Sequence, residues 1–103
     1  MELRVNDYVR TNKGTIDKLT KENIMTYEVA LMGFGEKPIK SSPNIIDLIE
    51  VGDYVNGVEV KDIDDEWVTM SDTKIPILKS IANGLIKSIV TKEQIENLEY
   101  EVE

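Results

Sequence analysis

The sequence predicts a mainly β protein, built from two tandem small antiparallel barrel units that each contain one short helix. The chain repeats itself, because Val5-Asn6-Asp7-Tyr8-Val9 returns as Val51-Gly52-Asp53-Tyr54-Val55. Short β-prone segments also follow one another every ~8 to 12 residues, separated by glycine turns. We therefore expect units over residues 1–50 and 51–103, packed as one compact protein because a unit of about 50 residues buries little surface alone.

The first unit is predicted to contain several strands and one short helix. Residues 24–31 are its best strand candidate, by length and by their β-branched and aromatic side chains. Asn12-Lys13-Gly14 predicts a turn, since glycine readily adopts the positive φ that a hairpin requires. Ser42 and Pro43 suit the N-cap and first position of a short buried helix over residues 44–49. The expected strands cover residues 7–11, 15–19, 24–31 and 39–41.

The second unit is predicted to begin with the strongest hairpin signal in the chain, Asn56-Gly57. Pro76 favours an edge position for its strand, because proline donates no backbone hydrogen bond. Thr91 and Gln94 have the spacing of a capping box, which predicts a short helix that ends near Asn97. The expected strands cover residues 54–55, 58–60, 67–71, 75–78, 85–90 and 98–102.

The composition leaves few side chains for catalysis. The chain has no cysteine and no histidine, which removes disulfides, thiolate and imidazole catalysis, and nearly all zinc, haem and iron–sulfur sites. We therefore expect a protein that is not an enzyme and needs no cofactor. No apolar run approaches the ~20 residues that cross a bilayer, and residues 1–4 lack the apolar core of a signal peptide. A cytoplasmic protein is expected.

Negative charge is concentrated in the second half of the chain. The net charge is −8; residues 1–50 carry 7 Lys+Arg against 8 Asp+Glu, and residues 51–103 carry 5 against 12. A surface of this sign repels nucleic-acid phosphates and anionic lipid. The charge therefore predicts a basic protein as partner, without direct contact to nucleic acid or membrane.

Two acidic groups and one tryptophan are predicted to contact that partner, as a surface that resembles the phosphate track of DNA. An EF-hand calcium loop is absent from the first group, because Trp67 stands where such a loop needs glycine. Trp67 either contacts a partner's Arg or Lys by a cation–π interaction or covers one end of a barrel. The alternative for the acids is a solubilising face. The predicted partner-binding residues are Asp62, Asp64, Asp65, Glu66, Trp67, Glu93, Glu96, Glu99 and Glu101.

Two other functions are alternatives to protein binding. One is a metal-dependent carboxylate enzyme, although no spacing singles out a carboxylate pair. Gly33-Phe34-Gly35 is interpreted as a loop and not as a phosphate site, because it leads into Pro38 and an extended Ile39, where a Walker loop has Gly-Lys and then a helix. The other alternative is a sponge for a nucleotide signal between the two units, with positive side chains from Arg4, Arg10, Lys13, Lys37 and Lys40.

Two resemblances add to these expectations. Val51-Gly52-Asp53-Tyr54-Val55 resembles the start of many SH3-like barrels, which implies two tandem SH3-like units. Residues 42–57 and 86–94 resemble small uncharacterised proteins from phages and prophages of Gram-positive Firmicutes, although residues 78–85 have no counterpart there. This resemblance implies a protein of the host-cell cytoplasm that interferes with defence, such as an anti-CRISPR-like inhibitor that occludes the nucleic-acid-binding surface of a host effector.

Overall fold

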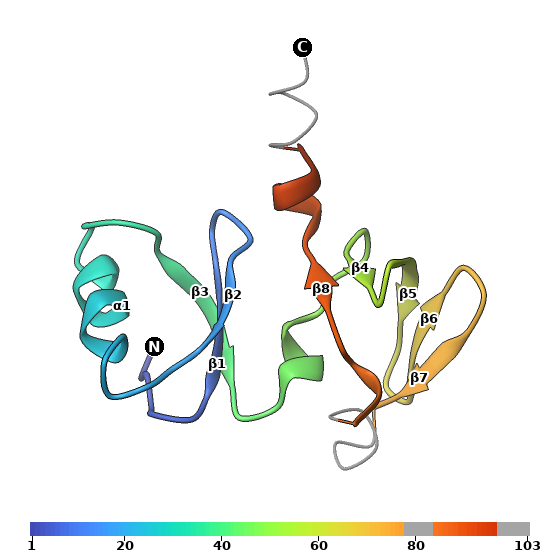
Figure 1. Ribbon diagram of the computed structural model, residues 1–103, viewed down its shortest axis with the longest axis horizontal. Helices are drawn as coiled ribbons and strands as arrows, with labels where there is room; N and C mark the ends of the chain where they lie inside the picture. Colours follow the sequence, from blue (N-terminus) through green and yellow to red (C-terminus); the bar gives the residue numbers. More distant parts are fainter. Residues whose placement is uncertain (78–83, 97–103) are drawn as a thin grey trace. The chain divides into compact units, whose positions relative to one another are not determined.

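The computed structural model describes residues 1–77 and 84–96. The chain divides into two compact units, unit 1 (Met1–Leu48) and unit 2 (Ile49–Glu103). The fold is mainly β, with one antiparallel sheet of three strands and one of five (Figure 1). The strands in these described ranges do not close into a barrel, and the SH3-like nature of the units stays a prediction.

Unit 1 contains the three-stranded sheet and most of the helical structure. Its central strand β1 (Tyr8–Thr11) pairs antiparallel with β2 (Ile16–Lys18) on one side and β3 (Pro38–Ser42) on the other. The helix α1 (Ile24–Leu31) connects β2 to β3, and the 3₁₀ turn η1 (Ile45–Leu48) follows β3. The predicted strands at 7–11, 15–19 and 39–41 are confirmed.

The predicted strand at 24–31 is wrong, because this segment is α1. Thr20 and Asn23 start the helix by exchanging hydrogen bonds: each side-chain oxygen accepts the other residue's backbone N–H. Ile24, Tyr27 and Leu31 then lie on one helical face, at the spacing i, i+3, i+7. This face packs on three buried side chains, those of Leu3, Val9 and Leu19. Burial of this face outweighs the β propensity of individual residues.

The short helix predicted after β3 is confirmed as η1. Ser42 Oγ accepts the N–H of Asn44 at 3.1 Å and donates to Asp47 Oδ2 at 2.6 Å, so the serine stabilises the turn as expected of a cap. Ile46 and Leu48 are buried. The apolar residues of this turn therefore contribute to the core, as the sequence predicts.

Unit 2 contains the five-stranded sheet, in the order β7-β6-β5-β4-β8. Neighbouring strands are antiparallel, and β7 is at the edge, as Pro76 predicts. Buried apolar residues of this unit include Ile49, Val55, Val60, Val68, Met70 and Ile75. The strands are β4 (Tyr54–Val55), β5 (Val58–Ile63), β6 (Trp67–Met70), β7 (Lys74–Pro76) and β8 (Ile89–Val90).

The turn and the helix cap predicted for unit 2 are confirmed, whereas one of its predicted strands is only partly right. The hairpin at Asn56-Gly57 is confirmed, with φ of 52° and 81° at its two central residues. The capping box is also confirmed: Thr91 N–H donates to Gln94 Oε1 at 3.0 Å, and residues 92–96 are helical. The strand predicted at 85–90 is only partly right, because β8 covers its last two residues and Leu85 is helical. The strand predicted at 98–102 lies outside the described residues.

Both units open with the same four-residue turn. In Arg4–Asp7 the fourth residue donates its N–H to the carbonyl of the first at 3.1 Å, and Glu50–Asp53 does the same at 3.1 Å. The third residue has a positive φ in both turns, 78° at Asn6 and 97° at Gly52. Type II turns require this conformation, which asparagine and glycine tolerate best. The repeated sequence therefore corresponds to a repeated backbone structure.

The strands that follow the two turns are arranged alike. The order β2-β1-β3 in unit 1 matches β5-β4-β8 in unit 2, and each pair is antiparallel. Asp7 O accepts the N–H of Leu19 at 2.7 Å, and Asp53 O accepts the N–H of Val60 at 2.8 Å. The units differ in what joins the second strand to the third: α1 in unit 1, and a segment that includes β6 and β7 in unit 2.

Candidate functional site

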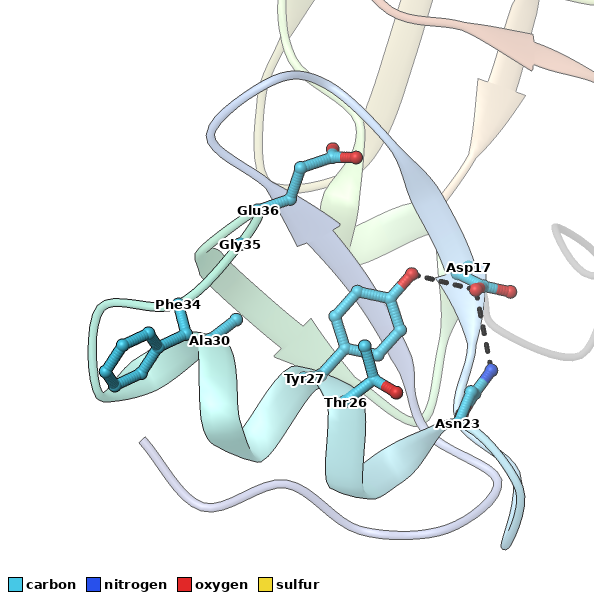
Figure 2. A pocket seen from close by; sticks show the side chains of 8 residues that line it. All are labelled: Asp17, Asn23, Thr26, Tyr27, Ala30, Phe34, Gly35 and Glu36. Atoms are coloured by element: carbon cyan, nitrogen blue, oxygen red, sulfur yellow. Dashed lines mark hydrogen bonds between the residues drawn. The ribbon is translucent and has the colours of Figure 1, made fainter.

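A cleft of about 210 Å³ opens in unit 1 between β2, α1 and the loop that follows α1 (Figure 2). Pockets for drug-sized ligands usually measure ~300 to 1,000 Å³, so this cleft has room for one side chain or a group of similar size. Its lining residues are Asp17, Asn23, Thr26, Tyr27, Ala30, Phe34, Gly35 and Glu36.

One wall of the cleft is fixed by hydrogen bonds to a carboxylate. Tyr27 Oη donates to Asp17 Oδ2 at 2.8 Å, and Asn23 Nδ2 approaches the same oxygen at 3.4 Å (Figure 2). Asn23 Nδ2 also donates to the Lys18 carbonyl at 2.9 Å, which holds the amide in place. Burial, the hydrogen bond to Asp17 and the charge of Asp17 raise the pKa of Tyr27 to about 12. Tyr27 is therefore a neutral donor at neutral pH.

A second carboxylate, that of Glu36, belongs to the loop between α1 and β3. Its Oε1 accepts hydrogen bonds from Thr15 Oγ1 at 2.7 Å and from Thr11 Oγ1 at 2.8 Å. These two bonds lower the pKa of Glu36, and the charge of Lys13 lowers it further. Glu36 is therefore ionised at neutral pH and adds negative charge to the cleft.

An exposed aromatic ring completes the cleft. Phe34 is 71% exposed. Figure 2 shows Phe34 and Asp17 at opposite sides of the view, with the Tyr27 ring between them and Glu36 above. Two aromatic side chains beside two carboxylates form a site suited to a small organic cation, through cation–π and ionic attraction.

The glycines at Gly33 and Gly35 do not form a phosphate site. They follow the C-terminal end of α1, where Gly33 N–H donates to the Ala30 carbonyl at 3.0 Å. Anions bind at helix N-termini, where N–H groups point outward, whereas the C-terminus carries a partial negative charge. The loop joins α1 to β3, and Glu36 makes its charge unfavourable for phosphate.

Five of the predicted partner-binding residues lie at the turn between β5 and β6. Asp64 Oδ1 accepts the N–H groups of Glu66 and Trp67, both at 2.8 Å, which lowers the pKa of Asp64. Asp62, Asp65 and Glu66 are exposed. Trp67 is the first residue of β6 and is 38% exposed. The structure thus brings an exposed indole and a cluster of carboxylates together.

The remaining predicted residues do not join this turn. Glu93 and Glu96 belong to the helix at 92–96, which lies at the other end of unit 2 from the β5–β6 turn in the view of Figure 1. Glu99 and Glu101 lie outside the described residues. Among the predicted residues that the structure describes, the acids therefore form two separate groups.

A buried carboxylate that the sequence did not single out anchors this helix. Asp53 has no exposed surface; its Oδ1 accepts the N–H of Lys92 at 3.0 Å and its Oδ2 accepts the N–H of Glu50 at 2.8 Å. Lys92 Nζ also pairs with Glu50 Oε1 at 2.9 Å. The only sequence signal was the place of Asp53 in the repeated motif. Its role is to fix the helix start to the opening turn of unit 2.

The positive residues proposed for a nucleotide site include one that is inaccessible. Arg10 has no exposed surface, and its Nη1 donates to the Leu48 carbonyl at 3.0 Å. A buried guanidinium that caps η1 is a structural group. Arg10 is therefore unavailable to a nucleotide, and the interpretation that included it is corrected.

Two further features limit the possible sites. Within residues 1–77 and 84–96, no three acidic side chains come together in a way that would hold a metal ion. These ranges therefore provide no set of carboxylate ligands for a metal-dependent enzyme. The helices in the same ranges are all too short or too polar to cross a membrane.

Comparison with known proteins gives no relative: no family model, no curated protein and no solved structure matches this chain. The candidate sites therefore rest on the geometry and charge of the chain's own residues.

Proposed function

We propose that the protein is a binding protein without chemistry of its own, which engages a basic surface of another protein through the β5–β6 turn. The observation that carries this proposal is the turn itself. Two backbone N–H groups, one of them that of Trp67, hold the pKa of Asp64 low, and Trp67 itself is 38% exposed. A carboxylate next to an indole attracts Arg and Lys side chains by two mechanisms at once.

The charge distribution supports the same partner. Residues 51–103 carry 12 Asp+Glu against 5 Lys+Arg. Such an excess accelerates encounter with a basic surface and weakens binding as salt rises, because exposed charges are screened over about 8 Å at physiological ionic strength. The proposed contact is therefore salt-sensitive.

The proposed partner class is a nucleic-acid-binding effector of host defence. Proteins that bind nucleic acid have basic surfaces that match phosphates, and a carboxylate-rich turn presents the same charge as a phosphate backbone. The resemblance of residues 42–57 to phage-encoded proteins supports defence as the setting. An anti-CRISPR-like inhibitor is the specific form of this proposal.

Affinity capture tests the proposal with one substituted turn and one matched control. The protein is used to capture partners from the lysate of a Firmicute host, with mass spectrometry and stepwise salt elution. Neutralising Asp65 and Glu66 in the β5–β6 turn is expected to lower the salt concentration at which a basic partner elutes. Asp72→Asn together with Glu22→Gln also removes two charges, at exposed positions outside this turn, and is expected to have little effect. Elution unchanged by the Asp65 and Glu66 substitutions would contradict the proposal.

A further inference from the structure

The outer face of α1 is an exposed apolar stripe. Ile24, Tyr27 and Leu31 face the core, whereas a second set of apolar side chains, on α1 and its C-cap residue, is exposed. The spacing of this second set is i, i+4, i+7, so its members line up along one side. The stripe consists of Met25, Val29 and Met32, with exposed fractions of 70%, 38% and 72%.

The stripe runs directly beside the acidic cleft. Thr26 and Ala30 follow Met25 and Val29 by one residue each, and both line the cleft. Phe34 lines the cleft too and stands two residues after Met32. Thr26 of the cleft and Val29 of the stripe are three positions apart on α1, so they are neighbours on the helix surface. Exposed apolar patches mark interaction sites.

We propose that the cleft binds the guanidinium group of an arginine from a protein partner, and that the α1 stripe packs against apolar residues that flank this arginine. Charge complementarity selects the occupant, since Asp17 and Glu36 both contribute carboxylates. Guanidinium is planar, so it stacks on an aromatic ring while its N–H groups bond carboxylate oxygens. Phe34 and Tyr27 supply the rings.

The volume and the negative charge of this cleft are unfavourable for a nucleotide or a phosphate group. A volume of about 210 Å³ is too small for a nucleotide. The lining contains two acids and no Lys or Arg, so phosphate would be repelled. This proposal uses unit 1 residues alone, and it stands or falls independently of the β5–β6 turn.

NMR titration of the full chain with N-acetyl-arginine-amide tests the cleft. Saturable shifts are expected for the backbone signals of Asp17, Tyr27 and Phe34, with a dissociation constant in the millimolar range. The citrulline analogue has nearly the same shape without the charge, so it is expected to bind at least about fivefold more weakly. Equal binding of the two probes, or no saturable shift at the cleft with the arginine probe, overturns the proposal.

Matched substitutions distinguish binding in the cleft from a general effect of negative charge on probe binding. Glu36→Gln is expected to weaken binding of the arginine probe about fivefold or more. Glu22→Gln removes the same charge from an exposed residue that does not line the cleft, so it is expected to weaken binding less. Phe34→Ala gives a second variant that leaves the threonine bonds of Glu36 in place. Equal weakening by Glu22→Gln and Glu36→Gln, or full affinity in Phe34→Ala, overturns the proposal.

Peptides test the apolar stripe. A peptide with one arginine between two leucines is expected to bind about tenfold more tightly than the same peptide with alanines, because leucine buries more apolar surface. Met32→Ser is expected to reduce this preference while it leaves binding of N-acetyl-arginine-amide unchanged. A preference for leucine that survives in Met32→Ser would overturn the assignment of the stripe.

Discussion

Units 1 and 2 begin with the same turn and the same three-strand arrangement, but they differ in the segment between the second and third strands. Unit 1 places α1 there, whereas unit 2 places β6 and β7. The cleft is lined mostly by α1 and its following loop, and the acidic turn starts the β6–β7 segment. The shared strands therefore act as a scaffold, and the differing segments carry the candidate binding sites.

A proline in the middle of α1 has the largest expected effect on stability, because α1 is helical. Val29→Pro removes a helical hydrogen bond and creates a steric clash, which costs about 3 kcal/mol or more. Far-UV circular dichroism should lose helical signal, and the urea midpoint should fall. Val29→Ala keeps the N–H and is expected to cost little at this partly exposed position. Similar stability of the two variants would contradict the helical assignment.

Local signals predicted turns and helix caps in both units. Asn56-Gly57 and the capping box at Thr91 specify structure through neighbouring residues, so they could be recognised without tertiary information. Residues 24–31 have side chains of high β propensity and also a helical spacing of apolar residues. Packing on Leu19 and its neighbours, with the hydrogen bonds between Thr20 and Asn23, favours the helix.

The cleft could not be predicted from the sequence, because its residues come from separate parts of the chain. Asp17 and Glu36 are 19 positions apart in the sequence and belong to different elements. Only the fold brings them to one cavity. The acidic turn, by contrast, is contiguous in sequence and could be named in advance, although the sequence did not show that Glu93 and Glu96 lie apart from it.

The aspartates at the fourth position of the two opening turns, Asp7 and Asp53, are expected to contribute differently to stability. Asp53→Ala removes the acceptor for two backbone N–H groups at a fully buried position, which is expected to lower the free energy of unfolding by about 2 kcal/mol. Asp7 holds the equivalent place in unit 1 and is only half-buried, so Asp7→Ala is expected to cost less. Far-UV circular dichroism during urea unfolding reports on both units, and the fluorescence of Trp67, the chain's single tryptophan, reports on unit 2. Equal losses in both variants would show that the two turns are stabilised alike.

Tyr27 is expected to make the protein sensitive to alkali. Its pKa is raised to about 12 in the folded state, against about 10 for an ordinary tyrosine. The resulting stabilisation is complete below about pH 10 and is lost as pH rises toward 12. Tyr27→Phe should therefore lose less stability than the wild type between pH 10 and pH 12 in urea unfolding. Identical pH dependence in the two proteins would contradict the buried hydrogen bond to Asp17.

Substitution of Glu36 has the smallest expected effect, a change in the free energy of unfolding at acidic pH. Its pKa is lowered in the folded state, so its contribution is present above the ordinary value near 4.5 and is lost as pH falls through the lowered pKa. The contribution is under about 1 kcal/mol, because the carboxylate is only part-buried and solvent screens its interactions. Glu36→Gln should flatten the acid limb of stability against pH, whereas Glu22→Gln should not. An unchanged acid limb in Glu36→Gln would contradict the bonds from Thr11 and Thr15.

Hydrogen exchange of the protein alone and with its captured basic partner tests the proposed function most directly. We predict that the partner slows exchange of the amides at residues 64–67, because the β5–β6 turn becomes covered. Amides in the turn between β6 and β7 should exchange at the same rate in both samples. Protection of the β6–β7 turn with none at residues 64–67 would contradict the account.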